Sequence, residues 1–152
     1  MTYRPHLQRS GRADRPAASE HDEQVAVVQW FAAAHRALDG HLFAIPNGGD
    51  RHAAVAAKLR AEGVRRGVPD LFLMLPRGQW SGLFIEMKRR NAPPSAVKTE
   101  QREFIDRAER HGYRAVACRG ADEAIAVITD YLGRTTQDAV DADGGTPDEV
   151  RG

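Results

Sequence analysis

The chain has 152 residues, of which 41% are hydrophobic and 28% charged, and its formal net charge is +1. This length suits one domain with a single hydrophobic core, and no apolar run is long enough to cross a membrane. The polar first sixteen residues lack the apolar stretch of a secretory signal, so we expect a cytoplasmic protein without membrane association.

The small net charge conceals a gradient along the chain. Residues 1–16 contain four Arg and one Asp, whereas residues 133–152 contain two Arg and five acidic residues. Neither end has apolar periodicity, so we expect a flexible Arg-rich arm over residues 1–18 and a disordered acidic tail over residues 133–152. The domain predicted between them, residues 19–132, holds sixteen basic and fifteen acidic residues. This balance is not typical of nucleic-acid binding.

The domain is predicted to begin with a helix. Ser19 is followed three residues later by Asp22, which resembles a helix-capping arrangement. The helix is expected to end near residues 38–40. Its apolar spacing predicts a buried stripe made by Val25, Val28, Trp30 and Phe31.

A strand, a loop and a second helix are expected next. Residues 41–45 form a short apolar run, which stops at Pro46-Asn47-Gly48-Gly49, a sequence that breaks regular structure and permits positive φ angles. Residues 51–62 are rich in Ala and predict a helix that Gly63 ends.

The second half of the domain is predicted to alternate strands and helices. Strands are expected at 71–75, 82–88 and 113–118, and helices at about 95–111 and 121–131. Cys118, the only cysteine, excludes an intrachain disulfide and a cysteine-cluster zinc site, and we interpret it as a small core residue. The element order predicts an α/β fold with a mixed central sheet flanked by helices.

Two neighbouring strands carry the residues with the clearest chemistry. Strand side chains alternate between faces, so Glu86 and Lys88 project from one side of their strand. If this strand pairs with the preceding one, Asp70 at the start of the first strand approaches Glu86 near the end of the second. Two carboxylates suit Mg²⁺, and a lysine beside them could orient an attacking water or neutralise charge on a phosphate. The alternative is that the strand ends in solvated charges.

Several motifs together resemble a known nuclease family. Pro-Asp opening an apolar strand and Glu-x-Lys closing the next one resemble the restriction-endonuclease-like superfamily. The wider set, in chain order, is similar to the VRR-NUC (virus-type replication-repair nuclease) family and covers roughly residues 19–132: Ile45-Pro46-Asn47-Gly48-Gly49, Arg51, Glu62-Gly63-Val64, Gly67-Val68-Pro69-Asp70, Glu86-Met87-Lys88 and Gln101. The resemblance implies a restriction-endonuclease-like core.

The resemblance also implies a metal-dependent active site. Asp70, Glu86, the Met87 carbonyl and Glu20 would bind Mg²⁺ or Mn²⁺, while Lys88 would assist the attacking water. Gln101 stands where the family places a glutamine near the site. Glu23 is a rival to Glu20, and the acids of this first helical turn could instead simply favour the positive end of the helix dipole.

Contacts to nucleic acid are predicted at a glycine-rich turn and a basic rim. Backbone amides at Asn47, Gly48 and Gly49 could approach a phosphate with Arg51 alongside. Other basic residues near the site could form a rim around an acidic cleft or be dispersed solvated side chains: Arg65, Arg66, Lys88, Arg89, Arg90 and Lys98.

The activity implied by the resemblance is hydrolysis of DNA phosphodiester bonds to leave a 5′-phosphate. The family relationship suggests a phage or prophage homodimer that acts on branched, flap or four-way-junction DNA in replication, recombination or repair. Exposed apolar positions on the last helix are one candidate for the dimer interface. Two alternatives remain open: a non-catalytic or partner-activated DNA-binding module with the same fold, and an RNA-directed nuclease.

Overall fold

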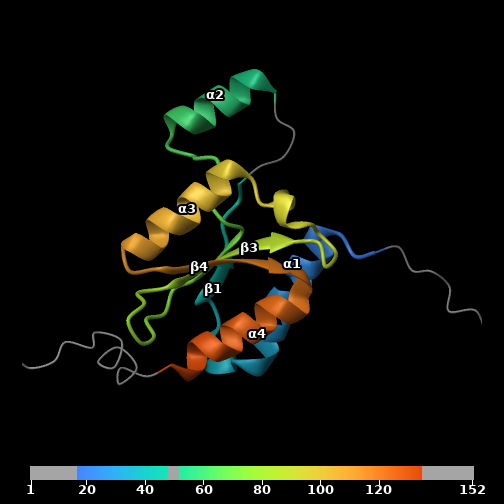
Figure 1. Ribbon diagram of the computed structural model, residues 1–152, viewed down its shortest axis with the longest axis vertical. Coiled ribbons are helices and arrows are strands. Elements are labelled where there is room, and N and C mark those ends of the chain that lie inside the picture. The colour runs from blue at the N-terminus through green and yellow to red at the C-terminus, as the bar shows by residue number, and fades with distance from the viewer. Residues whose placement is uncertain (1–16, 48–51, 135–152) are drawn as a thin grey trace, which may run out of the picture.

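A computed structural model describes residues 17–47 and 52–134 of the chain. Most of the predicted arm and tail lies outside these residues, and so do Gly48, Gly49 and Arg51. In the part described, a four-stranded sheet lies between helices, as Figure 1 shows. This arrangement confirms the predicted α/β class.

The sheet has the order β1-β2-β3-β4, made by Leu42–Ala44, Leu71–Leu73, Leu83–Lys88 and Arg114–Arg119. β1 and β2 are antiparallel, as are β2 and β3, whereas β3 and β4 are parallel. A parallel pair requires a crossover connection, which helix α3 (Thr99–Arg110) provides. The mixed sheet therefore follows directly from a hairpin-like pair joined to one strand-helix-strand unit.

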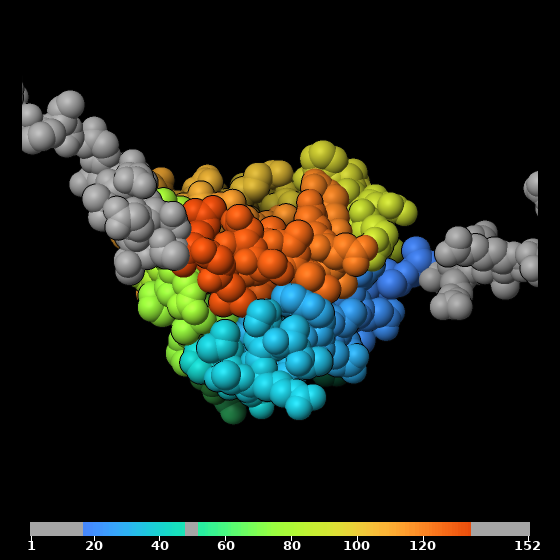
Figure 2. Space-filling model, turned by 90° about the horizontal axis from the view of Figure 1, so that it is seen from below, coloured from blue at the N-terminus to red at the C-terminus, as the bar shows by residue number. Residues whose placement is uncertain are grey.

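Helices cover both faces of this sheet. α1 (Glu20–Ala34) and α4 (Gly120–Gly133) pack against each other and against β3, whereas α3 packs on the other face against β4. Figure 1 shows these two layers, and Figure 2 shows α1 and α4 side by side over one face. α2 (Ala53–Ala61) lies beyond α3 and has no buried residue.

Two predicted helix boundaries were wrong. The first helix ends at Ala34 and is followed by a separate 3₁₀ turn over Arg36–Leu38, so the helix is shorter than expected. Another 3₁₀ turn, Pro94–Ala96, precedes α3, which starts at Thr99. A short 3₁₀ turn, and not the α-helix, thus occupies each of these stretches.

The predicted stripe of α1 was also partly wrong. Val25 and Val28 are 38% and 36% exposed, whereas Val27 and Phe31 are buried. Val27 and Phe31 are four residues apart and continue a row that begins at Glu23, also buried. Of the four residues predicted for the stripe, only Phe31 is buried, and the observed buried row starts from a glutamate. The predicted Ser19–Asp22 capping box is confirmed, with each residue's side chain accepting from the other's amide.

The main core lies between the sheet and the pair α1 and α4. Leu71, Leu73, Leu83, Ile85 and Met87 from the central strands are almost completely buried there. Cys118 belongs to the same cluster, and burial raises the pKa of its thiol to about 12. This agrees with the interpretation of Cys118 as a core residue and not a nucleophile.

The opposite face of the sheet carries a layer of aromatic rings. The ring centroids of Phe72 and Phe84 are 4.4 Å apart, and Phe104 of α3 packs edge-on against Phe84. Because side chains alternate along β3, Phe84, Glu86 and Lys88 share this face. The face is therefore apolar under α3 and becomes ionisable toward the end of β3.

Gly67 fixes the loop before β2 against the first turn of α3. Its φ of +83° is a conformation that L side chains rarely adopt, and a Cβ at this position would lie 2.4 Å from the Glu100 carbonyl oxygen. Only glycine permits this approach of backbone to backbone. The contact brings the segment leading to Asp70 beside the helix that carries Gln101.

Gly67→Ala is expected to destabilise the protein much more than Gly63→Ala. Both glycines have positive φ angles, but a Cβ at Gly63 meets nothing within 4 Å. Alanine at Gly63 should cost about 1–2 kcal/mol from backbone conformation alone. At Gly67 the same cost is joined by the clash with α3, and thermal or urea unfolding should show the difference. Equal losses in the two variants would contradict the close approach.

Candidate active site

The β2–β3 pairing brings the two predicted carboxylates together. Leu71 is paired with Ile85, so Asp70 precedes the paired part of β2 where Glu86 continues β3. The Met87 amide donates a 2.7 Å hydrogen bond to Asp70 Oδ2. Since the N–H and C=O of one strand residue point toward the same strand edge, the Met87 carbonyl also faces the Asp70 side.

Glu86 is held by two partners through one of its oxygens. Lys88 Nζ lies 2.9 Å from Glu86 Oε1, and Gln101 Nε2 donates a hydrogen bond to the same oxygen. The Glu86 and Lys88 residues are only 3% and 6% exposed. Lys88 therefore belongs to the floor of the site and not to a solvated rim, which corrects that part of the sequence prediction.

Gln101 connects this carboxylate to the start of α3. Its Oε1 accepts a 2.8 Å hydrogen bond from the Lys98 amide, which is at the N-cap of the helix. Its Nε2 is the donor to Glu86. The side chain thus satisfies one free amide of the helix end while orienting Glu86.

Burial dominates the electrostatics of the two acids. The pKa of Glu86 is raised to about 7, first by burial and then by the charge of the neighbouring Asp70, against the opposing effect of Lys88. The pKa of Asp70 is also raised by burial, opposed by the Met87 amide and by Lys88. Two close carboxylates that are costly to ionise together form a place where a proton or a cation is favoured.

These residues line an open cleft of about 860 Å³. Its acidic residues are Glu20, Asp70, Glu86 and Glu100, and its basic residues are Arg66, Lys88 and Lys98. Of the other basic residues predicted for a rim, Arg65 and Arg89 are exposed but do not line this cleft. Glu100, in the first turn of α3, was not predicted as a site residue because no motif or spacing in the sequence singles it out.

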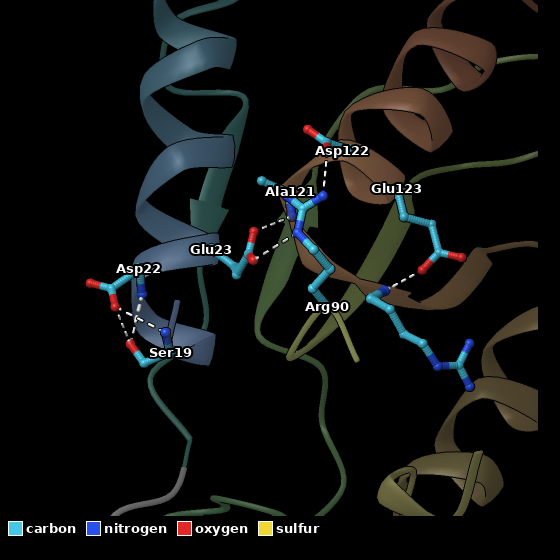
Figure 3. A network of polar contacts seen from close by, with 8 residues as sticks. Ser19, Asp22, Glu23, Arg90, Ala121, Asp122 and Glu123 are labelled. Atoms are coloured by element: carbon cyan, nitrogen blue, oxygen red, sulfur yellow. Dashed lines mark hydrogen bonds and ion pairs between the residues drawn. The ribbon is translucent and has the colours of Figure 1, made fainter. Parts of the chain in front are cut away.

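Glu20 and Glu23 have different surroundings. Glu20 lines the cleft and disfavours ionisation of both Asp70 and Glu86 through its charge. Glu23 is buried, accepts a hydrogen bond from the Ala121 amide and pairs with Arg90, as Figure 3 shows. Arg90 is engaged with Glu23 and Asp122 outside the cleft.

Asn47 lines the cleft but already has structural partners. Its Nδ2 donates to the carbonyls of Arg65, at 2.8 Å, and Val68, at 3.1 Å. The side chain therefore ties the loop after β1 to the segment before Asp70. Gly48, Gly49 and Arg51, the other predicted members of this phosphate-binding turn, lie outside the described residues.

The donor set fits a hard cation. Asp70 Oδ2 and Glu86 Oε1 are occupied by protein donors, whereas Asp70 Oδ1 and Glu86 Oε2 have no hydrogen-bond partner among the residues described. These two oxygens and the Met87 carbonyl are the ligand type that Mg²⁺ prefers. No cluster of three or more His, Cys, Asp or Glu suited to a metal occurs within residues 17–47 and 52–134, so Glu20 does not complete such a cluster.

Comparison with known proteins identifies the class of this domain. The sequence profile of the VRR-NUC domain matches residues 9–122, and the chain belongs to the VRR-NUC family of nuclease domains. The chain is also similar to a solved structure described as a VRR_NUC domain protein, with a TM-score of 0.69 and 29% sequence identity. That match covers 80% of this chain and 93% of the other. The search of curated proteins found no match.

No helix in the described ranges is both long and apolar enough to span a membrane. This finding agrees with the absence of long apolar runs noted in the sequence.

In the metal-free protein, Glu86 is expected to lower the free energy of unfolding as the pH rises from about 4.5 to about 7. In this window the folded protein retains a proton on Glu86 that the unfolded chain has released, so rising pH favours unfolding. The melting temperature of the wild type should therefore fall relative to that of Glu86→Gln, which cannot ionise there. Added Mg²⁺ or Mn²⁺ should reduce the fall in the wild type only. A difference between the two proteins that stays constant with pH would contradict the raised pKa.

Proposed function

We propose that this protein is a Mg²⁺- or Mn²⁺-dependent endonuclease that hydrolyses DNA phosphodiester bonds. The observation that carries the proposal is the state of two neighbouring carboxylates, the buried Glu86 and the half-buried Asp70. Each has one oxygen fixed by protein donors and the other left for a ligand. Membership of the VRR-NUC family supports nuclease chemistry at this site.

Asp70 Oδ1, Glu86 Oε2 and the Met87 carbonyl would hold the cation, with Glu20 nearby in the same cleft. When bound, the cation would polarise the phosphate and favour ionisation of the attacking water. The protein contributes a preset arrangement of oxygens, because the Met87 amide orients Asp70 and Gln101 orients Glu86.

Lys88 would act on the water and the phosphate. Its ammonium is held beside Glu86 at the buried floor of the cleft, where a charge interacts strongly because water is largely excluded. A substrate phosphate in the cleft would bring negative charge within reach of Lys88. The ammonium could then donate a hydrogen bond to the attacking water or to a phosphate oxygen as charge develops in the transition state.

Arg66 and Lys98 are the best placed residues for contacts to the DNA backbone. They line the same cleft from two segments, one before Gly67 and one at the N-cap of α3, which the Gly67 contact holds together. Their charges offset the acids on the floor and give an anionic substrate a favourable approach. Arg65 and Arg89 remain candidates for contacts outside the cleft.

We further propose that the substrate is branched, flap or four-way-junction DNA, cut to leave a 5′-phosphate in phage or prophage DNA metabolism. The basis for this part, and for a homodimer, is the resemblance of the sequence motifs to those of the family. Side-chain exposure does not favour the last helix, α4, as the dimer interface. Large hydrophobic side chains that are well exposed in the described part of the chain lie elsewhere, at Val25, Val28, Phe43, Val55 and Met74.

Asp70→Asn and Lys88→Met are expected to abolish cleavage without unfolding the protein. Asparagine keeps an acceptor for the Met87 amide but removes the charge needed by the cation, and methionine keeps the length of Lys88 without its ammonium. Activity should fall at least about a hundredfold in each. The measurement is cleavage of labelled duplex, nicked, flap and four-way-junction DNA in Mg²⁺, Mn²⁺ or EDTA. Asp106→Asn, an exposed acid on α3, is the matched control.

The same assay separates the alternative functions. Cleavage of RNA in preference to every DNA would make the protein an RNA-directed nuclease. A folded wild type that binds branched DNA but cuts nothing with either metal would favour a non-catalytic or partner-activated module. Cleavage that persists in EDTA, or in both site variants, would remove Asp70 and Lys88 from the mechanism.

Arg66→Ala and Lys98→Ala are expected to weaken DNA binding more than catalysis. Each should raise KM for DNA, lower the salt dependence of binding by about one ion and leave kcat at saturating DNA close to that of the wild type. Arg102→Ala is the control, because Arg102 is an exposed cation of α3 that does not line the cleft. An effect of Arg102→Ala equal to the other two would show that only overall charge matters.

A further inference from the structure

A polar junction joins α1, the end of β3 and the start of α4. Its members are Glu23 of α1, Arg90 just after β3, and the first residues of α4, Ala121 and Asp122. Figure 3 shows Glu23 and Arg90 pointing toward each other from α1 and the end of β3, with the start of α4 beside both. None of these four residues lines the cleft.

Glu23 supplies a cap for α4 from a different helix. The Ala121 amide donates a 2.6 Å hydrogen bond to Glu23 Oε2. The side chain of Arg119, the N-cap residue of α4, makes no capping hydrogen bond to the first amides of the helix. The first amides of a helix need acceptors, and a carboxylate there also interacts favourably with the helix dipole. The buried charge of Glu23 is thus compensated by α4 on one oxygen.

Arg90 compensates the other oxygen and extends the junction. Its Nε lies 3.5 Å from Glu23 Oε1, and its guanidinium forms a 2.6 Å ion pair with Asp122. Gly120 permits the close fit, because a Cβ there would approach Arg90 Cβ to 3.3 Å and Glu23 Oε2 to 3.4 Å, at a φ of +79°. α1, the end of β3 and the start of α4 are consequently fixed relative to one another.

Two members of the junction lie close in sequence to residues of the cleft. Glu23 follows Glu20 by three residues, which places their side chains about 60° apart around α1. Arg90 follows Lys88 by two residues. The Glu20 side chain has no hydrogen bond or ion pair with any residue that the structure describes, so its position depends on how α1 is oriented.

We propose that Glu23 and Arg90 are positioning residues, which set the rotation of α1 and the end of β3 so that Glu20 and Lys88 face the cation site. The inference rests on the proposed function, since it assigns the junction to the same metal-dependent reaction. Glu23 and Arg90 touch neither substrate nor cation. Their effect passes through the orientation of the two site residues that they adjoin.

The positioning role differs from a purely structural one in a measurable way. Arg90 is about half exposed, so its ion pairs should contribute little to global stability. A structural pair would affect only unfolding. A positioning pair should change the affinity for the cation in protein that remains folded, because turning α1 would move the charge of Glu20 relative to the cation site.

The test compares Glu23→Gln and Arg90→Gln with Glu109→Gln. Glu109 is also a helical glutamate paired with an arginine, Arg114, but it joins the end of α3 to the start of β4, away from the cleft. For each variant, Mn²⁺ binding is measured by calorimetry, cleavage is titrated with Mg²⁺, and unfolding is followed by circular dichroism. Glutamine at Glu23 keeps an acceptor for the Ala121 amide while removing the charge.

The expected result is a several-fold increase in the Mn²⁺ dissociation constant and in the Mg²⁺ concentration for half-maximal cleavage, in Glu23→Gln and Arg90→Gln only. High Mg²⁺ should restore most of kcat, with KM for DNA unchanged. Cation affinities equal to those of Glu109→Gln would overturn the inference, whatever the melting temperatures. If Glu23→Gln does not fold, Arg90→Gln decides alone. A wild type that neither binds Mn²⁺ nor cuts nucleic acid would instead overturn the proposed function.

Discussion

The burial of Glu86 beside Asp70 is the constraint around which the rest of the site is organised. Loss of hydration raises the pKa of both carboxyl groups, and the charge of Asp70 adds to the effect on Glu86. Lys88 offsets part of this cost with its charge. Gln101 and the Met87 amide offset another part with hydrogen bonds. The remaining free oxygens define where a cation would complete the compensation.

The fold provides these partners from separate elements. β2 and β3 supply the acids and the lysine, while α3 supplies Gln101 because Gly67 lets the preceding loop approach its first turn. The aromatic rings of Phe72, Phe84 and Phe104 hold α3 on the same face. Hydrophobic packing at one end of the face thus positions ionisable groups at the other end.

Sequence reasoning succeeded where a local pattern decides the outcome. Period-two alternation correctly placed Glu86 and Lys88 on one face, and the motif order identified the family that the profile match confirms. It failed where tertiary contacts decide. The stripe of α1 was misassigned because Glu23 is buried through the amide of Ala121, almost a hundred residues later, and no local spacing encodes that partner. The basic rim was overestimated for the same reason, since Arg90 and Lys88 already have acidic partners.

The single free oxygen on the buried Glu86 and on the half-buried Asp70 implies a conflict between the stability of the fold and activity. The carboxylates are most costly to the fold where the protein would do its chemistry, so neutral residues of the same shape would relieve repulsion at Asp70 and Glu86. Carboxylates placed where ionisation is disfavoured contribute nothing to the packing of the sheet, which is the pattern expected of groups that bind a ligand.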